Sequence, residues 1–363
     1  MGGLDAMTAL AAALPRHSAD PIAVMVVDDS AVVRGMISRQ IQTQPDMILA
    51  GSAANGEMAL VELRRRPIDV IVLDIEMPVM DGLTALPLLL RARPGVRVLI
   101  ASTLTRRNAE IGFKALQLGA SDWLGKPDSL VAAEDFNRDL VAKIRAVAPR
   151  ETPHPAAASA VPVVSAPTGQ PRPQVVAIGG STGAPPVLTR LFEMLRGRVE
   201  QPIFITQHMP PTFTAILAEQ LARHGERPCA EAIHGERVRP GHAYVAPGGW
   251  HMTVGRDGPD PIIRLNQDAP ENFCRPAVDP MLRSLAEIYG RGVFAVILTG
   301  MGADGAKGCA AVRAAGGRFA VQDEASSVVW GMPGAAAKSG GAEKVLPPAA
   351  LATYLIQATS RPA

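Results

Sequence analysis

Short apolar runs that end in a polar residue alternate, along the first half of the chain, with stretches in which apolar residues recur at helical spacing. Uninterrupted β-branched runs of this length are typical of buried strands, and a 3.6-residue period is typical of helices that cover them. The predicted strands are 22–27, 70–73, 96–101 and 122–124. The predicted helices are those following Ser30 and Gly82 and those over 57–65, 108–118 and 135–147. This alternation predicts five βα units in a doubly wound parallel sheet.

The second half repeats the pattern with glycine-rich turns. Apolar runs at 175–178, 203–206 and 293–298 predict strands, and 187–195 predicts a helix. We therefore expect a second α/β domain with a parallel sheet, of a Rossmann-like type.

A proline-, alanine-, serine- and threonine-rich stretch separates the two halves. It has few charges and no helical or strand periodicity, which is typical of an extended linker. A chain of 363 residues is long enough for two domains, each with its own core. The predicted organisation is a disordered tail over 1–21, a first domain over 22–148, a linker over 149–173 and a second domain over 174–359.

Composition narrows the class of protein. With 36 basic and 34 acidic residues the formal charge is only +2, so nucleic acid is not an expected partner. The three cysteines are widely spaced without a C-x-x-C, which argues against a disulfide framework or a cysteine zinc site. No run of about 20 apolar residues and no export signal is found, so we expect a cytoplasmic protein that is not itself membrane-embedded.

Five polar residues fall at the carboxyl ends of strands in the first domain. These are Asp28, Asp29, Asp74, Ser102 and Lys126. In doubly wound sheets ligands bind outside this edge, so the five side chains are expected to converge. Clustered carboxylates suit a hard cation such as Mg²⁺, and a lysine with a hydroxyl suits a phosphoryl group.

The second domain opens on a strand that runs into Gly179-Gly180-Ser181-Thr182-Gly183. As Gly-x-Ser-x-Gly this is the nucleophile-elbow pattern of serine hydrolases, in which Ser181 is exposed at a tight turn. As a glycine-rich turn that opens a helix it equally fits a phosphate or nucleotide cradle. The turn alone does not distinguish these two hypotheses.

Two further strand ends favour the hydrolase. His208 follows the strand at 203–206, and Asp304 lies on the glycine-rich turn after 293–298. On one parallel sheet these ends can bring Ser181, His208 and Asp304 together as nucleophile, base and orienting carboxylate. The Thr182 amide, next after the nucleophile, is the expected oxyanion donor.

The first domain resembles the receiver domain of two-component response regulators, which have a flavodoxin-like five-stranded fold. The matching segments are 26–30, 73–82, Ser102 and Lys126-Pro127. The resemblance implies that Asp74 accepts a phosphoryl group from a chemotaxis histidine kinase. It also implies that Mg²⁺ is bound by Asp28, Asp29, Asp74 and the Glu76 carbonyl, and that Ser102 and Lys126 contact the phosphate.

Residues 174–359 resemble the catalytic domain of chemotaxis-type protein-glutamate methylesterases. Six motifs occur in the family's order, at 177–183, 207–210, 244–249, 275–279, 298–305 and 331–333. The resemblance implies hydrolysis of γ-glutamyl methyl esters on methyl-accepting chemoreceptors, with glutamine deamidation as a related activity and no cofactor for the hydrolysis. It also implies that Met301 contributes to the oxyanion site.

Two other hypotheses stay open at this point. A response regulator with a non-catalytic phosphate- or nucleotide-binding output domain explains the glycines, although it does not explain His208 and Asp304. A methylesterase paralogue serving a non-flagellar chemosensory pathway would carry the same motifs.

Overall fold

The computed structural model describes residues 20–103, 105–126, 130–149 and 171–360. Within them the chain divides into two compact units, each built around one parallel sheet, and we describe each unit by itself. The predicted tail over 1–21 and linker over 149–173 fall almost wholly outside the described residues. The predicted domain boundaries therefore stay predictions.

The first unit contains a five-stranded parallel sheet in the order β2-β1-β3-β4-β5. Helices α2 and α3 pack together, and so do α1 and α5. The strands are β1 Ile22–Val27, β2 Met47–Ala53, β3 Val70–Asp74, β4 Arg97–Ser102 and β5 Asp122–Gly125. The helices of this unit are α1 Ala31–Gln42, α2 Gly56–Arg65, α3 Gly82–Ala92 and α5 Leu130–Val147. Helix α4, Arg106–Gln117, connects β4 to β5 in the chain but is grouped with the second unit.

The predicted doubly wound class is confirmed for this unit, but one strand was not located from the sequence. The missing strand, β2, lies at the edge of the sheet and has exposed and half-buried positions between its buried ones. An edge strand of this kind lacks the continuous apolar run that reveals a central strand. The central strands β1 and β3 are buried along nearly their whole length, which is why the pattern found them.

The second unit contains a seven-stranded parallel sheet in the order β14-β13-β12-β6-β7-β9-β8. An antiparallel hairpin, β10–β11, stands apart from this sheet. The strands are β6 Val175–Gly180, β7 Ile203–Gln207, β8 Cys229–Glu231, β9 Ala243–Val245, β10 His251–Asp257, β11 Asp260–Asn266, β12 Val293–Ile297, β13 Arg318–Gln322 and β14 Lys344–Leu346. The helices are α6 Ala184–Leu195, α7 Pro211–Gly225, α8 Val278–Tyr289, α9 Ala306–Ala314, α10 Met332–Lys338 and α11 Pro348–Thr359.

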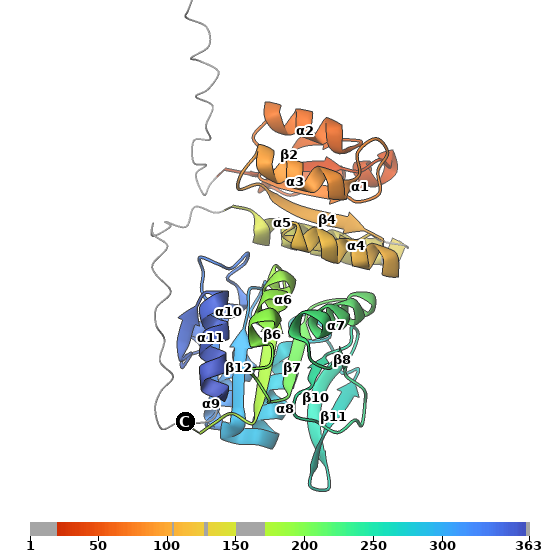
Figure 1. The fold of residues 1–363 in the computed structure, drawn as a ribbon. Coiled ribbons are helices and arrows are strands. Elements are labelled where there is room, and N and C mark those ends of the chain that lie inside the picture. Colours follow the sequence, from red (N-terminus) through yellow and green to blue (C-terminus); the bar gives the residue numbers. More distant parts are fainter. Residues whose placement is uncertain (1–19, 104, 127–129, 150–170, 361–363) are drawn as a thin grey trace, which may run out of the picture. The chain divides into compact units, whose positions relative to one another are not determined.

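The order of the central strands determines which of the segments that follow them lie close together. Strands β12, β6 and β7 are direct neighbours, and Figure 1 shows them side by side. Because all three are parallel, the segments that follow them meet at one edge. Apolar side chains of helix α8, including Val278, Met281 and Leu282, belong to the buried core, and the helix contacts all three strands. The antiparallel hairpin β10–β11 was not predicted from the sequence, and neither were strands β8, β9, β13 and β14.

Helix α6 begins three residues before the predicted start. Its first turn contains Pro185 and Pro186, where proline is well tolerated because these amides have no partner within the helix. Gly183 precedes the helix in a left-handed conformation, φ 78°, that favours glycine. Among the described residues no helix is both long and apolar enough to cross a bilayer.

Candidate active site

In the first unit, the acidic residues predicted at the strand ends do lie together. Lys126 Nζ is 2.8 Å from Asp28 Oδ2 and 2.8 Å from Asp74 Oδ1, so the ammonium bridges the two carboxylates. Asp29 joins them: oxygens of Asp28, Asp29 and Asp74 lie within 4.8 Å of one another. Three carboxylates in this arrangement are a hard-oxygen donor set that suits Mg²⁺.

Burial sets the electrostatics of this acidic site. It raises the pKa of the Asp74 carboxyl, an effect that Lys126 opposes and that the Asp28 charge reinforces. Burial also opposes charging of Lys126, but hydrogen bonds to Asp28 and Asp74 outweigh it and raise the pKa of the lysine. The site therefore holds a firmly protonated lysine beside a carboxylate that is costly to keep charged.

Ser102 and Glu76 complete the set of predicted residues. Ser102 is buried at the end of β4, and its carbonyl accepts a 2.8 Å hydrogen bond from the Lys126 amide. This bond fixes the segment that carries the lysine against β4. Glu76 lies two residues after Asp74 with an exposed side chain, so only its backbone is suited to the metal-binding role implied for it.

In the second unit, Ser181 directly follows β6. Its amide donates a 3.1 Å hydrogen bond to the Thr299 carbonyl, beyond the end of β12. Its own carbonyl accepts a 2.9 Å bond from Gln207 Nε2, at the end of β7. The turn that carries Ser181 is thus tied to both neighbouring strands, as a preorganised nucleophile requires.

His208 follows β7, and its amide donates a 3.2 Å hydrogen bond to the Gly180 carbonyl, next to Ser181. Both nitrogens of its ring have a hydrogen-bond partner. Nε2 is 2.7 Å from Asp304 Oδ2, and Nδ1 is 3.3 Å from Cys274 Sγ. Asp304 therefore binds Nε2 of the imidazole, which leaves Nδ1 as the nitrogen that can exchange a proton with a nucleophile.

Asp304 is buried and accepts hydrogen bonds from the start of helix α8. The amides of Val278 and Asp279 donate to it at 2.6 and 3.0 Å, and the Gly305 amide donates at 2.9 Å. Asn272 Nδ2 donates to Asp304 Oδ1 at 3.0 Å. A helix N-terminus stabilises a carboxylate through its free amides and its dipole.

These contacts raise the pKa of His208 and lower the pKa of Asp304. Burial opposes ionisation of Asp304, but His208 and the amide donors outweigh it and lower the pKa of the carboxyl. Burial likewise opposes protonation of His208, but Cys274 and Asp304 raise the pKa of the imidazole to about 10. The Asp304 carboxylate is therefore fixed in its charged form and favours the imidazolium.

The predicted oxyanion donors are Thr182, next to Ser181 in the chain, and Met301, which follows a glycine that packs on Ser181. Gly300 is packed so closely on the serine that a Cβ placed on it would lie 2.8 Å from Ser181 Cβ. Met301 follows this glycine. Thr182 is buried, and its carbonyl accepts a 3.0 Å hydrogen bond from Thr299 Oγ1.

The structure brings two of the three predicted triad residues into contact and shows two neighbours that the sequence did not indicate. The His208 ring contacts Asp304 as predicted, whereas its other hydrogen-bond partner is Cys274 rather than Ser181. Asn272 was also overlooked, although it bonds to Asp304. Cys274 directly precedes the motif at 275–279 and Asn272 lies three residues before it, and this proximity was the available signal.

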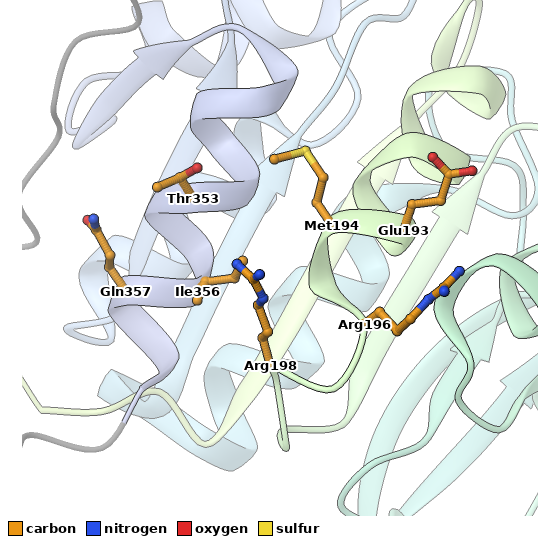
Figure 2. A pocket seen from close by; sticks show the side chains of 7 residues that line it. All are labelled: Glu193, Met194, Arg196, Arg198, Thr353, Ile356 and Gln357. Carbon is orange, nitrogen blue, oxygen red and sulfur yellow. The ribbon is translucent and has the colours of Figure 1, made fainter.

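A separate cavity of about 380 Å³ contains none of these residues. It lies between helices α6 and α11 (Figure 2). Its lining residues are Glu193, Met194, Arg196, Arg198, Thr353, Ile356 and Gln357. Because it opens at the C-terminal end of α6, away from the turn at which that helix begins, it is not part of the candidate active site.

Together, the acidic site on one parallel sheet and the Ser181, His208 and Asp304 edge on another define a class: a response regulator whose second domain has the elements of a serine hydrolase. The family model described as CheB methylesterase matches residues 176–355, and that of the response regulator receiver domain matches residues 24–133. The chain belongs to the CheB methylesterase family.

Similar proteins span nearly the whole chain. A protein-glutamate methylesterase/protein-glutamine glutaminase 1 of Rhodospirillum rubrum is 48% identical over 371 residues, covering 94% of this chain and 96% of that protein. A protein with the same name from Paramagnetospirillum magneticum is 49% identical over 375 residues, covering 96% and 98%. The crystal structure of the Thermotoga maritima CheB methylesterase catalytic domain is 40% identical, covers 51% of this chain and 98% of that chain, and has a TM-score of 0.50.

Proposed function

We propose that the protein is a phosphorylation-regulated protein-glutamate methylesterase that acts on methyl-accepting chemoreceptors in the cytoplasm. The observation that carries this proposal is the 2.7 Å contact of His208 Nε2 with the buried Asp304, at the edge where Ser181 follows β6. The names of the full-length relatives support the same activity and add glutamine deamidation as a second one.

In the acylation step, Ser181 Oγ attacks the ester carbonyl and gives its proton to His208 Nδ1. For this the hydroxyl must take the place that Cys274 Sγ holds at Nδ1, 3.3 Å away. The Asp304 carboxylate stabilises the imidazolium that forms. The imidazolium then donates the proton to the leaving methoxide, and methanol departs from the glutamyl-serine ester.

Deacylation reverses the roles with water. Neutral His208 removes a proton from water, hydroxide adds to the acyl carbon, and the proton returns to Ser181 as glutamate is released. The Thr182 amide follows Ser181 in the chain, and the Met301 amide follows Gly300, which packs on Ser181. Both amides are suited to bind the negative oxygen of both tetrahedral intermediates. Attack on a glutamine side chain follows the same path with ammonia as the leaving group.

The first unit supplies the regulation. Asp74 would accept a phosphoryl group from a histidine kinase, with Mg²⁺ held by Asp28, Asp29, Asp74 and the Glu76 carbonyl. The three-carboxylate donor set fits that ion. Mg²⁺ would neutralise charge on the transferring group, while Lys126 and Ser102 would bind phosphate oxygens. We expect phosphorylation to relieve an inhibition of the esterase by the receiver.

The non-catalytic alternative is not favoured, since a phosphate-binding turn gives no reason for an imidazole held by a buried carboxylate. A methylesterase that serves a non-flagellar pathway has the same site and differs only in its receptor.

The test is methanol release from a panel of methylated chemoreceptors, with the full chain treated with Mg²⁺ and acetyl phosphate. We expect release from at least one receptor and faster release after phosphorylation. Equilibrium binding of nucleotides is measured in parallel. Tight nucleotide binding without methanol release from any receptor would contradict the proposal.

A further inference from the structure

A four-residue turn beside His208 presents a single aromatic ring to solvent. The turn, 271–274, closes with two backbone hydrogen bonds: the Glu271 amide donates to the Cys274 carbonyl at 3.2 Å, and the Cys274 amide donates to the Glu271 carbonyl at 2.9 Å. Between them, Phe273 is 95% exposed. Large aromatic side chains are usually among the most buried, so this degree of exposure needs a reason.

The backbone at this turn is held in an unfavourable conformation. Asn272 has φ 52° and Phe273 has φ 63°, both in the left-handed region. Asparagine tolerates this region, but for a bulky aromatic residue it is an outlier. Such conformations persist where the surroundings enforce them, and they concentrate at functional sites.

The other three members of the turn are each fixed by their side chains. Glu271 Oε2 accepts a 3.0 Å hydrogen bond from Arg283 Nη1 on helix α8. Asn272 Nδ2 donates to Asp304 Oδ1 at 3.0 Å and to Asp279 Oδ2 at 3.2 Å. Cys274 Sγ lies 3.3 Å from His208 Nδ1. Three of the four side chains thus fasten the turn to the catalytic edge or to the helix that supports it.

The segments on both sides of the turn are fixed as well. Arg275 Nη1 donates to the carbonyls of Gln267 and Asp268 at 2.9 and 3.1 Å. The buried His251 is 3.2 Å from the Ala269 carbonyl through Nε2 and accepts a 3.2 Å bond from the Ala277 amide at Nδ1. The turn that carries Phe273 is therefore held in place by hydrogen bonds on both sides. A ring presented in this way can bind a partner without a large cost for ordering it.

We infer that Phe273 is a specificity-determining residue that docks the polypeptide of the methylated receptor next to the reacting ester. This inference rests on the proposed function. The next residue, Cys274, touches the His208 base, so a chain seated on the ring also lies beside the triad. A small free ester needs only the triad and its oxyanion donors, whereas a receptor helix extends beyond them to an apolar contact. Buried aromatic anchors of this kind often carry much of the binding energy of an interface.

Two variants separate the ring from the strained backbone. F273A removes the ring and keeps an unfavourable φ, whereas F273G removes the ring and relieves it, because glycine adopts positive φ readily. For the full chain, kcat/KM is measured with methylated receptor and with N-acetylglutamate γ-methyl ester. We expect both variants to lower the receptor-to-ester ratio of kcat/KM at least tenfold, through a higher KM for the receptor. F273Y keeps an aromatic ring and should restore the ratio.

The matched control is I233A, which truncates another exposed apolar side chain of the same unit, 67% exposed and outside the turn. It should leave the ratio as in the wild type. An equal loss on both substrates would mean that Phe273 only supports the turn and would overturn the inference. So would an unchanged ratio, or faster ester hydrolysis by unphosphorylated F273G, which would assign the ring to the receiver instead.

A binding measurement keeps this inference separate from the proposed function. The S181A chain and the S181A/F273G chain are titrated with methylated receptor, whose esters should stay intact. We expect a Kd at least tenfold higher for the double variant, and equal Kd values would overturn the role of Phe273. If the proposed function itself fails, the wild type releases no methanol, and the two Kd values still decide whether the ring binds the receptor.

Discussion

Both units place a buried aspartate at the carboxyl edge of a parallel sheet, but the two carboxylates are held in opposite ways. Asp74 is the last residue of β3 and faces Lys126 and a second carboxylate, Asp28. Asp304 lies well beyond β12 and accepts four N–H donors in addition to the His208 ring. Burial raises the pKa of Asp74, whereas in Asp304 the donors overcome burial and lower the pKa.

This difference matches the two kinds of chemistry. A carboxylate that is costly to keep charged gains from bonding to a phosphoryl group or from a bound cation, so Asp74 is suited to react. A carboxylate saturated with donors is stabilised as an anion, so Asp304 is suited to orient His208 and stay unchanged. We therefore expect the same edge of the same kind of sheet to hold one aspartate that reacts and one that stays unchanged.

The largest expected effect is on the nucleophile. In S181A, kcat for methanol release from methylated receptor should fall on the order of 100,000-fold, because loss of a triad nucleophile removes the covalent pathway. The matched control is S339A, since Ser339 is an exposed serine of the same unit. Thermal unfolding followed by circular dichroism should be the same for both variants. Hydrolysis by S181A at more than a few per cent of the wild-type rate would remove Ser181 from the mechanism.

The second-largest expected loss of activity follows from replacing Asp304. D304N keeps the shape but replaces an oxygen that accepts N–H bonds with an amide that donates them, against the amides of Val278 and Asp279. It also removes the charge that stabilises the imidazolium. We expect kcat to fall by roughly 1,000- to 10,000-fold, as for other triad aspartates. D279N changes the other carboxylate that Asn272 Nδ2 contacts. A smaller loss of kcat in D279N would identify Asp304 as the residue that orients His208.

The contrast between the two sites also explains how far the sequence could predict them. The acidic site is made by residues at or just after strand ends, so locating β1, β3, β4 and β5 was enough to assemble it. The triad edge depends on a turn that closes across the fold: Asn272 and Cys274 reach Asp304 and His208 from 32 and 66 residues away. No periodicity marks such contacts. The edge strand β2 and the hairpin β10–β11 were missed because strand patterns that are only partly buried give weak signals.

The third-largest expected effect is the loss of phosphorylation when Asp74 is replaced. In D74N, phosphoryl transfer from acetyl phosphate should fall to background, and the stimulation of methanol release by acetyl phosphate should disappear. Chelation of Mg²⁺ by EDTA should have the same consequence in the wild type, since the ion neutralises the transferring group. D81N is the control, because Asp81 caps helix α3 at an exposed position. Phosphorylation of D74N at the wild-type level would mean that another residue is the acceptor.

The smallest expected effect is a shift of the pH profile. Although burial opposes it, Cys274 and Asp304 raise the pKa of His208 to about 10, so the neutral base needed to activate Ser181 increases as pH rises toward that value. C274A removes one of the two groups that favour the imidazolium, and the pKa of His208 should fall. The acid limb of kcat/KM should therefore move to lower pH, and the variant should gain relative activity at neutral pH. C229A, which alters the half-buried cysteine at the start of β8, should leave the limb in place. A profile that does not move in C274A would mean that the thiol leaves Nδ1 before the base acts.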